Sequence, residues 1–104
     1  MNTADRARFE EANKAIHPVE KQWHFPIMTK YGYEAVTKEG IGFVRSYTYR
    51  HPTMDRSMTV TTGASADYWD DPNPNGGHGY WSDLEPHLIK LNRAGAIERL
   101  ADCL

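Results

Sequence analysis

The stretch that decides the fold is IGFVRSYTYRH, residues 41–51, in which apolar and polar side chains alternate. In an extended chain its apolar residues share one face: Ile41, Phe43, Tyr47 and Tyr49. Small and polar side chains occupy the other face, which is the pattern of a half-buried β-strand. Arg45 interrupts the apolar face, so we expect it to lie at an edge, to form a pair or to mark a site.

A second alternating run follows after a short turn. It is SMTVTT, residues 57–62, with Met58 and Val60 on the inward face. Because only a few turn residues separate the two runs, we expect 41–51 and 57–62 to pair as an antiparallel hairpin. A shorter run at 33–37 extends this hairpin to a meander.

Helical periodicity occurs at both ends of the chain. Residues 4–16 place three apolar residues on one face: Phe9, Ala12 and Ile16. Near the other end, the run from Ser82 to Glu85 matches a capping box, which predicts a helix that Ser82 caps. The buried stripe of that helix would be Leu84, Leu88 and Leu91. Gly95 is a typical helix stop, so 96–103 is expected to form a separate short helix.

The segment between these regions fits two interpretations. Val19, Trp23 and Ile27 recur at helical spacing, and Gly32 is placed to end a helix in the left-handed conformation. Pro26 would either interrupt this helix or begin a second one. A strand at 24–29 is the alternative.

The order of elements predicts the fold class. A helix, several strands and a helix form an α+β domain, here with a small antiparallel sheet of three to four strands flanked by an N-terminal and a C-terminal helix. The sequence has 104 residues, so we expect residues 1–104 to be a single domain.

Charge and cysteine content restrict the functional class. The formal net charge is −2, which lacks the basic excess typical of nucleic-acid binders. Cys103 is the only cysteine in the sequence, so no intrachain disulfide forms. No apolar run approaches the length of a bilayer span. We therefore expect a cytoplasmic protein that has no membrane partner.

The loop DPNPNGG, residues 71–77, has the spacing of the first half of a calcium-binding loop. Its first ligands and its turn residue would be Asp71, Asn73, Asn75 and Gly76. The glutamate that should stand at the twelfth position is Ser82 instead. Proline, asparagine and glycine are also ordinary turn residues. We expect residues 70–79 to form an exposed loop without metal; an enzyme or metal protein that uses Asp71 and His78 is an alternative.

Aromatic pairs stand on both sides of this loop, beside an acidic rim. Tyrosine and tryptophan dominate binding hot spots, so we interpret this segment as a contact surface for a partner. The candidate partner-binding residues are Tyr68, Trp69, Asp70, Asp71, His78, Tyr80 and Trp81. The alternative is that the rings fasten the loop onto the core.

Basic and aromatic side chains are interleaved around 44–51. Such a pattern suits phosphate contact and base stacking, and a solvated strand face with tyrosines in the core is the alternative. The candidate RNA-facing residues are Arg45, Arg50, His51 and Arg56. The run GFVRSYTYRHPTMDRSMTV, followed by the leucine-striped helix, resembles HicA-type mRNA interferase toxins. That resemblance implies a double-stranded-RNA-binding-like fold, although the family's catalytic Gly-Ser-His motif has no counterpart at residues 44–47.

The sequence contains no nucleophile-elbow, P-loop or dinucleotide-binding motif. We therefore expect a non-enzymatic protein without a cofactor. The predicted function is that of a small cytosolic binding protein that docks on a macromolecular partner, in the first instance a protein. Phage and mobile-element accessory proteins, including inhibitors of host defence, are of this type. The alternative is an RNA-binding or ribonuclease-like domain of the HicA pattern, with nucleic acid as its partner.

Overall fold

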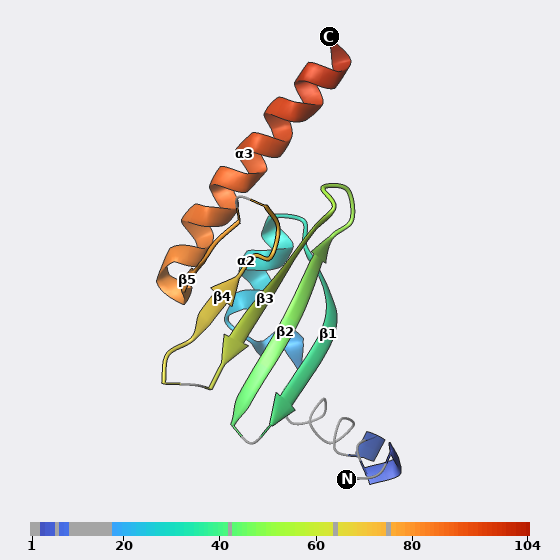
Figure 1. The fold of residues 1–104 in the computed structure, drawn as a ribbon, viewed down its shortest axis with the longest axis vertical. Helices are drawn as coiled ribbons and strands as arrows, with labels where there is room; N and C mark the ends of the chain where they lie inside the picture. Colours follow the sequence, from blue (N-terminus) through green and yellow to red (C-terminus); the bar gives the residue numbers. More distant parts are fainter. Residues whose placement is uncertain (1–2, 6, 9–17, 42, 64, 75) are drawn as a thin grey trace.

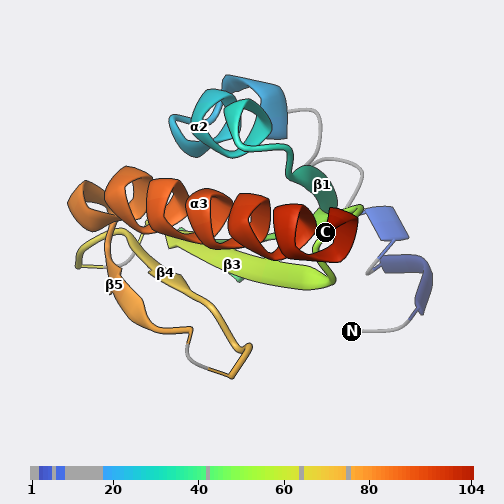
Figure 2. The same ribbon diagram turned by 90° about the horizontal axis from the view of Figure 1, so that it is seen from above.

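The fold is an antiparallel sheet with its helices on one face (Figures 1 and 2). The computed structural model describes residues 3–5, 7–8, 18–41, 43–63, 65–74 and 76–104. Within these, the elements are η1 (Val19–Lys21), α2 (His24–Lys30), β1 (Glu34–Ile41), β2 (Val44–His51), β3 (Arg56–Thr62), β4 (Tyr68–Asp70), β5 (His78–Tyr80), η2 (Trp81–Asp83) and α3 (Leu84–Cys103). The predicted α+β class is confirmed. Most of the helix expected over 4–16 lies outside the described residues.

The five strands follow one another in the sheet in sequence order, β1-β2-β3-β4-β5, as a simple meander. The predicted hairpin is confirmed, because β2 pairs antiparallel with β3 and Tyr49 lies opposite Met58. The alternation has the predicted effect: Tyr47, Tyr49, Met58 and Val60 are all buried. These side chains form the centre of the core, because a strand directs alternate residues to the same face.

The beginning of this hairpin differs from the expectation. β1 extends to Ile41 and β2 begins at Val44, so the alternating run 41–51 belongs to two strands. Phe43 lies between them and is 92% exposed, which makes its predicted place in the core wrong. Glycine is a turn residue, and the glycine at position 42 of the sequence is the signal for this break.

The segment after Pro18 forms helices rather than a strand. The 3-10 helix η1 leads into α2, whose inner face buries His24 and Met28 against the sheet. Gly32 has a φ of +88°, which confirms it as the left-handed residue after this helix. A side chain at this position would also approach the ring of His51, so both the backbone and the space favour glycine.

The last helix, α3, packs on the sheet only through its first half. Leu84 and Leu88 are buried, and Leu91 is half-buried against the core. The second half extends beyond the sheet (Figure 1). The predicted stop at Gly95 is wrong, because the helix continues to Cys103. Gly95 has another use: a Cβ there would lie 2.6 Å from Met54 Sδ in the β2–β3 turn.

The predicted cap at Ser82 is also wrong. Ser82 lies inside η2, and the extended residue that precedes this helical stretch is Tyr80, with φ −83° and ψ 159°. Asp83 occupies the N-cap position of α3 with helical dihedrals and makes no capping hydrogen bond with its side chain. A serine caps a helix from an extended conformation, so a preceding 3-10 turn removes the geometry that the capping box requires.

The long excursion expected between the hairpin and α3 contains two short strands. β4 pairs with β3, and β5 pairs with β4, so the sheet is wider than the three to four strands that were predicted. In the described part of the chain, no helix is long and apolar enough to cross a membrane.

Candidate functional site

One face of the sheet is left uncovered by the described helices. Figure 2 shows α2 and α3 together on one side of the strands, and Figure 1 looks onto the other side. Three cross-strand rows lie on this open face. The first consists of Tyr80, Tyr68, Thr61, Ser46 and Glu39, the second of His78, Asp70, Thr59, Thr48 and Thr37, and the third of Ser57, Arg50 and Glu34. The face is therefore polar and rich in threonine, with two tyrosines at the β4–β5 end.

Those two tyrosines border a hollow. Tyr68 and Tyr80 stand opposite each other on β4 and β5, and they are 43% and 62% exposed. The hollow has a volume of about 610 Å³. Its lining residues are Ser65, Ala66, Tyr68, His78, Gly79, Tyr80 and Asp83. Three of the predicted contact residues, Tyr68, His78 and Tyr80, are thus brought together on the open face.

Trp69 is a structural residue. It points to the side opposite Tyr68, is only 4% exposed, and stacks on the His87 ring of α3 with centroids 4.2 Å apart. Its indole Nε1–H donates to the Tyr80 carbonyl oxygen at 3.1 Å. Gly79 lies close under the same indole, where a Cβ would be 3.1 Å from the ring. Trp69 therefore fastens the β4–β5 hairpin to α3, which was the alternative interpretation of the aromatic pairs.

Asp71 is buried, although residues 70–79 were expected to form an exposed loop. Its side chain is fully buried, and its Oδ2 lies 3.4 Å from both Arg56 Nη1 and His87 Nε2. The Asn73 backbone N–H and side-chain amide donate to its other oxygen at 3.0 and 2.5 Å. A buried carboxylate needs such partners, so Asp71 is the anchor of its loop.

The described residues of the loop 71–77 are held by backbone hydrogen bonds as well, whereas Asn75, one of the expected calcium ligands, lies outside the described residues. The Asp71 N–H donates to the Gly77 carbonyl at 2.7 Å, and the Gly76 N–H donates to the Asn73 carbonyl at 2.8 Å. Among the described residues, no group of three or more histidine, cysteine, aspartate or glutamate side chains is arranged to hold a metal ion. The ordinary turn chemistry of the loop is sufficient to explain its shape.

Trp81 packs against Trp23, the residue that precedes α2. It is 56% exposed, and its ring lies 5.7 Å from that of Trp23 in an edge-on arrangement. Trp23 Nε1–H donates to Asp67 Oδ2 at 2.9 Å, and Asp67 Oδ1 accepts from the Gly63 N–H at 3.2 Å. Trp81 is thus partly packed against Trp23 and partly exposed, and it is not among the residues that line the hollow.

The four candidate RNA-facing residues do not gather on one surface. Arg50 is exposed on the open face, opposite Glu34 of β1. Arg45 and His51 share the other face of β2 with the buried tyrosines. His51 is buried, and its Nδ1 accepts from the Thr53 and Met54 N–H groups. Arg56 is held at Asp71. The strand alternation that places the tyrosines in the core also separates these basic residues.

A buried histidine was missed by the sequence interpretation. His24 is fully buried, 4.6 Å from the Tyr47 ring centroid, and its Nδ1 lies 2.5 Å from Tyr49 Oη. Its Nε2 is buried and makes no hydrogen bond within the described residues. Burial lowers the pKa of His24 to about 4, although the carboxylate of Asp67 acts in the opposite direction. No motif in the sequence could have indicated this position, because its partners come from distant strands.

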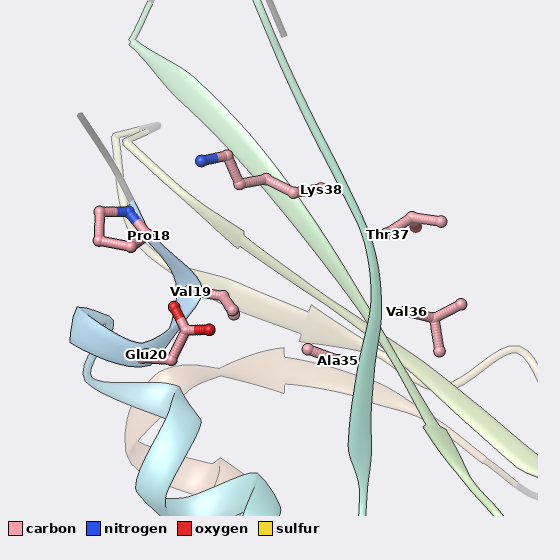
Figure 3. Close-up of a pocket in the computed structure, with 7 residues that line it drawn as sticks. All are labelled: Pro18, Val19, Glu20, Ala35, Val36, Thr37 and Lys38. Carbon is pink, nitrogen blue, oxygen red and sulfur yellow. The ribbon is translucent and has the colours of Figure 1, made fainter. Parts of the chain in front are cut away.

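A second surface is a groove at the edge strand β1, with a volume of about 280 Å³ (Figure 3). Val19 and Ala35 face each other across it, whereas Val36 and Thr37 point away. The register shift between Ala35 and Thr37 is an irregularity of the β-bulge type. A bulge and a lysine, here Lys38, are devices that hinder the pairing of an edge strand with another strand. This groove is therefore a weaker candidate for docking than the tyrosine hollow.

Comparisons with protein-family models, with curated proteins and with solved structures found no significant match to this chain.

Proposed function

We propose that this chain is a small binding protein that docks on a protein partner through the open face of β4 and β5. The observation that supports this proposal is the position of Tyr68 and Tyr80. They stand side by side and exposed at a hollow, on a sheet face that the described helices leave uncovered. We name the contact surface formed by Tyr68, His78, Tyr80 and Asp83 the tyrosine surface.

The chemistry of the tyrosine surface suits protein recognition. Tyrosine and tryptophan provide large contact areas with few rotatable bonds, so they lose little entropy when a partner orders them. The strands beneath them are fastened by the Trp69–His87 stack and by the buried Asp71. A surface on such a rigid support needs little rearrangement when it binds.

RNA binding is not favoured by the arrangement of the basic side chains. Phosphate recognition requires several lysines or arginines on one surface, and only Arg50 of the four candidates is exposed on the open face. The more specific prediction of a phage or mobile-element accessory protein, or of an inhibitor of host defence, depends on small size and on the lack of a catalytic motif. It stays a prediction.

The test is a comparative capture from the native cell with three tagged baits. The baits are the parent protein, a Tyr68→Ser, Tyr80→Ser double variant, and a Val36→Ser control. Val36 is 56% exposed on the edge strand, so its replacement also removes exposed apolar area, but far from the hollow. A protein that the parent and the control retain, and the double variant loses, supports the proposal.

Equal capture by all three folded baits would refute docking through this surface. Melting temperatures of the three baits provide the check on folding, and substitutions of exposed residues usually change stability by less than about 0.5 kcal/mol.

A further inference from the structure

We infer that the hollow between Tyr68 and Tyr80 binds a cationic side chain, arginine or lysine, from an extended segment of the protein partner. This inference rests on the proposed docking function and names the chemistry of the segment that docks. Three features support it: the aromatic walls, the sign of the charges around them, and the fixed backbone below.

The hollow has aromatic walls. Tyr68 and Tyr80 are cross-strand neighbours on the same face of the sheet, and both rings line the hollow. The face of a tyrosine ring attracts a cation through its quadrupole. A side chain that enters the hollow can contact both tyrosines. Arginine and lysine also carry apolar stems that bury well along aromatic surface while the charge stays near water.

The charges around the hollow favour a positive guest. Asp83 lines it, is exposed, and makes no capping hydrogen bond to α3, so its carboxylate is directed to no helix amide. Asp70 is exposed in the neighbouring row on the same face. The two cross-strand rows that begin at Tyr80 and His78 contain no lysine or arginine, and Arg50 lies in the third row of this face, on β2. An anionic guest at the hollow, such as a nucleic-acid phosphate, would face Asp83 and Asp70 with no lysine or arginine in those two rows.

The backbone below the hollow is fixed before binding. Gly79 lies close to the Trp69 indole, and a Cβ at that position would be only 3.1 Å from the ring, so the close contact favours glycine. The Trp69 Nε1–H holds the Tyr80 carbonyl, and the Trp81 N–H donates to the Asp67 carbonyl at 3.3 Å. The Asp71 N–H, which donates to the Gly77 carbonyl at 2.7 Å, ties the other end of the strand pair. The two tyrosines are therefore presented from strands that are held at both ends, which lowers the entropy lost on docking.

The experiment is an NMR titration of the full chain with matched peptides. Each is a short, blocked Gly–Ser peptide that carries arginine, lysine, citrulline or glutamate at alternate positions. Citrulline has nearly the shape of arginine without its charge, so it isolates the electrostatic contribution. The arginine and lysine peptides are expected to shift the amide signals of Tyr68, Gly79, Tyr80 and Asp83. Citrulline should bind at least several-fold more weakly, and raising NaCl from about 50 to about 500 mM should weaken the arginine peptide.

Variants locate the effect. Tyr68→Leu retains apolar bulk but removes the aromatic face, and it should weaken the arginine peptide about two- to fivefold. Asp83→Asn should weaken it by a similar factor. The matched control is Glu39→Gln, which removes the same charge from the far strand of the same row and should leave the affinity unchanged.

Several results would overturn the inference. These are no binding of the arginine and lysine peptides at millimolar concentration, equal binding of citrulline, tighter binding of the glutamate peptide or of oligouridine, and signal changes away from the hollow. If the capture experiment still shows a partner that depends on Tyr68 and Tyr80, then docking stands and only the cationic guest is wrong. If the peptides bind as expected but capture ignores both tyrosines, the proposed docking function is wrong.

Discussion

Acidification should destabilise this protein through the fully buried histidine His24. Its ring lies between Tyr47 and Tyr49, and burial lowers its pKa from 6.5 to about 4. The unfolded chain takes up a proton near pH 6.5, whereas the folded chain takes it up only near pH 4. Between these values the unfolded state binds more protons, so the free energy of unfolding falls as the pH falls through this window.

The magnitude follows from the pKa difference. A fall from 6.5 to about 4 corresponds to a loss of up to about 3 kcal/mol of stability, complete once the pH is below the folded pKa. That is a large part of the roughly 5–15 kcal/mol that usually stabilises a small domain. Above about pH 6.5 the histidine is neutral in both states, so this contribution is then fully present.

The assay is urea unfolding, followed by tryptophan fluorescence, at a series of pH values for the parent and for His24→Gln. Carboxylates contribute equally to both proteins, so the difference between the two curves isolates His24. Tyr49→Phe serves as a second comparison. This variant should be about 1 kcal/mol less stable at every pH, because it lacks the hydrogen bond between Tyr49 and His24. Its stability should keep the same pH dependence, because burial is the main cause of the pKa shift of His24.

Parallel curves for the parent and His24→Gln would refute this reasoning. So would a direct NMR titration of the parent in which the His24 ring protonates at its ordinary pKa while the protein stays folded. The second measurement does not depend on the variant being able to fold.

Four further substitutions test the packing. Leu88→Ala should lower the free energy of unfolding by about 2–4 kcal/mol, because the Leu88 side chain is buried. Leu100→Ala, on the projecting half of α3, should lower it by less than about 0.5 kcal/mol. Equal denaturation midpoints for the two variants would contradict the assigned core. Asp71→Ala should lower the free energy of unfolding, measured in urea, by about 3 kcal/mol, because it leaves Arg56 and His87 without their buried carboxylate. An unchanged stability would mean that Asp71 does not anchor the loop. Ser82→Ala should change the melting temperature little, since Ser82 does not cap α3; a loss of about 1 kcal/mol would restore the capping box.

Local periodicity allowed part of the fold to be predicted. The alternation in 41–51 and 57–62 predicted β2, β3 and their pairing, although β2 begins only at Val44, because a strand repeats every two residues and its inward face is visible in the sequence. The stripe that begins at Leu84 and Leu88 identified the buried face of α3 for the same kind of reason, with the helical period. These properties depend on neighbours along the chain.

The ends of these elements were harder to predict, because they depend on what packs beside them. Gly95 has the chemistry of a helix stop, yet it lies inside α3, where Met54 approaches it from the β2–β3 turn. Ser82 has the spacing of a cap, yet the 3-10 turn before α3 places it in a helical stretch. In both cases a contact or an approach direction from elsewhere outweighs the local preference.

The sequence by itself determined the sheet-and-helix class and the position of the aromatic segment, but the tertiary structure decided which of its residues face outward. β4 and β5 have three residues each, too few for a recognisable period, so Tyr68 and Trp69 could not be assigned to opposite faces in advance. Asp71 is buried because Arg56 and His87 reach it from other elements. Burial of a polar group requires partners, and partners distant along the chain meet only in the folded molecule.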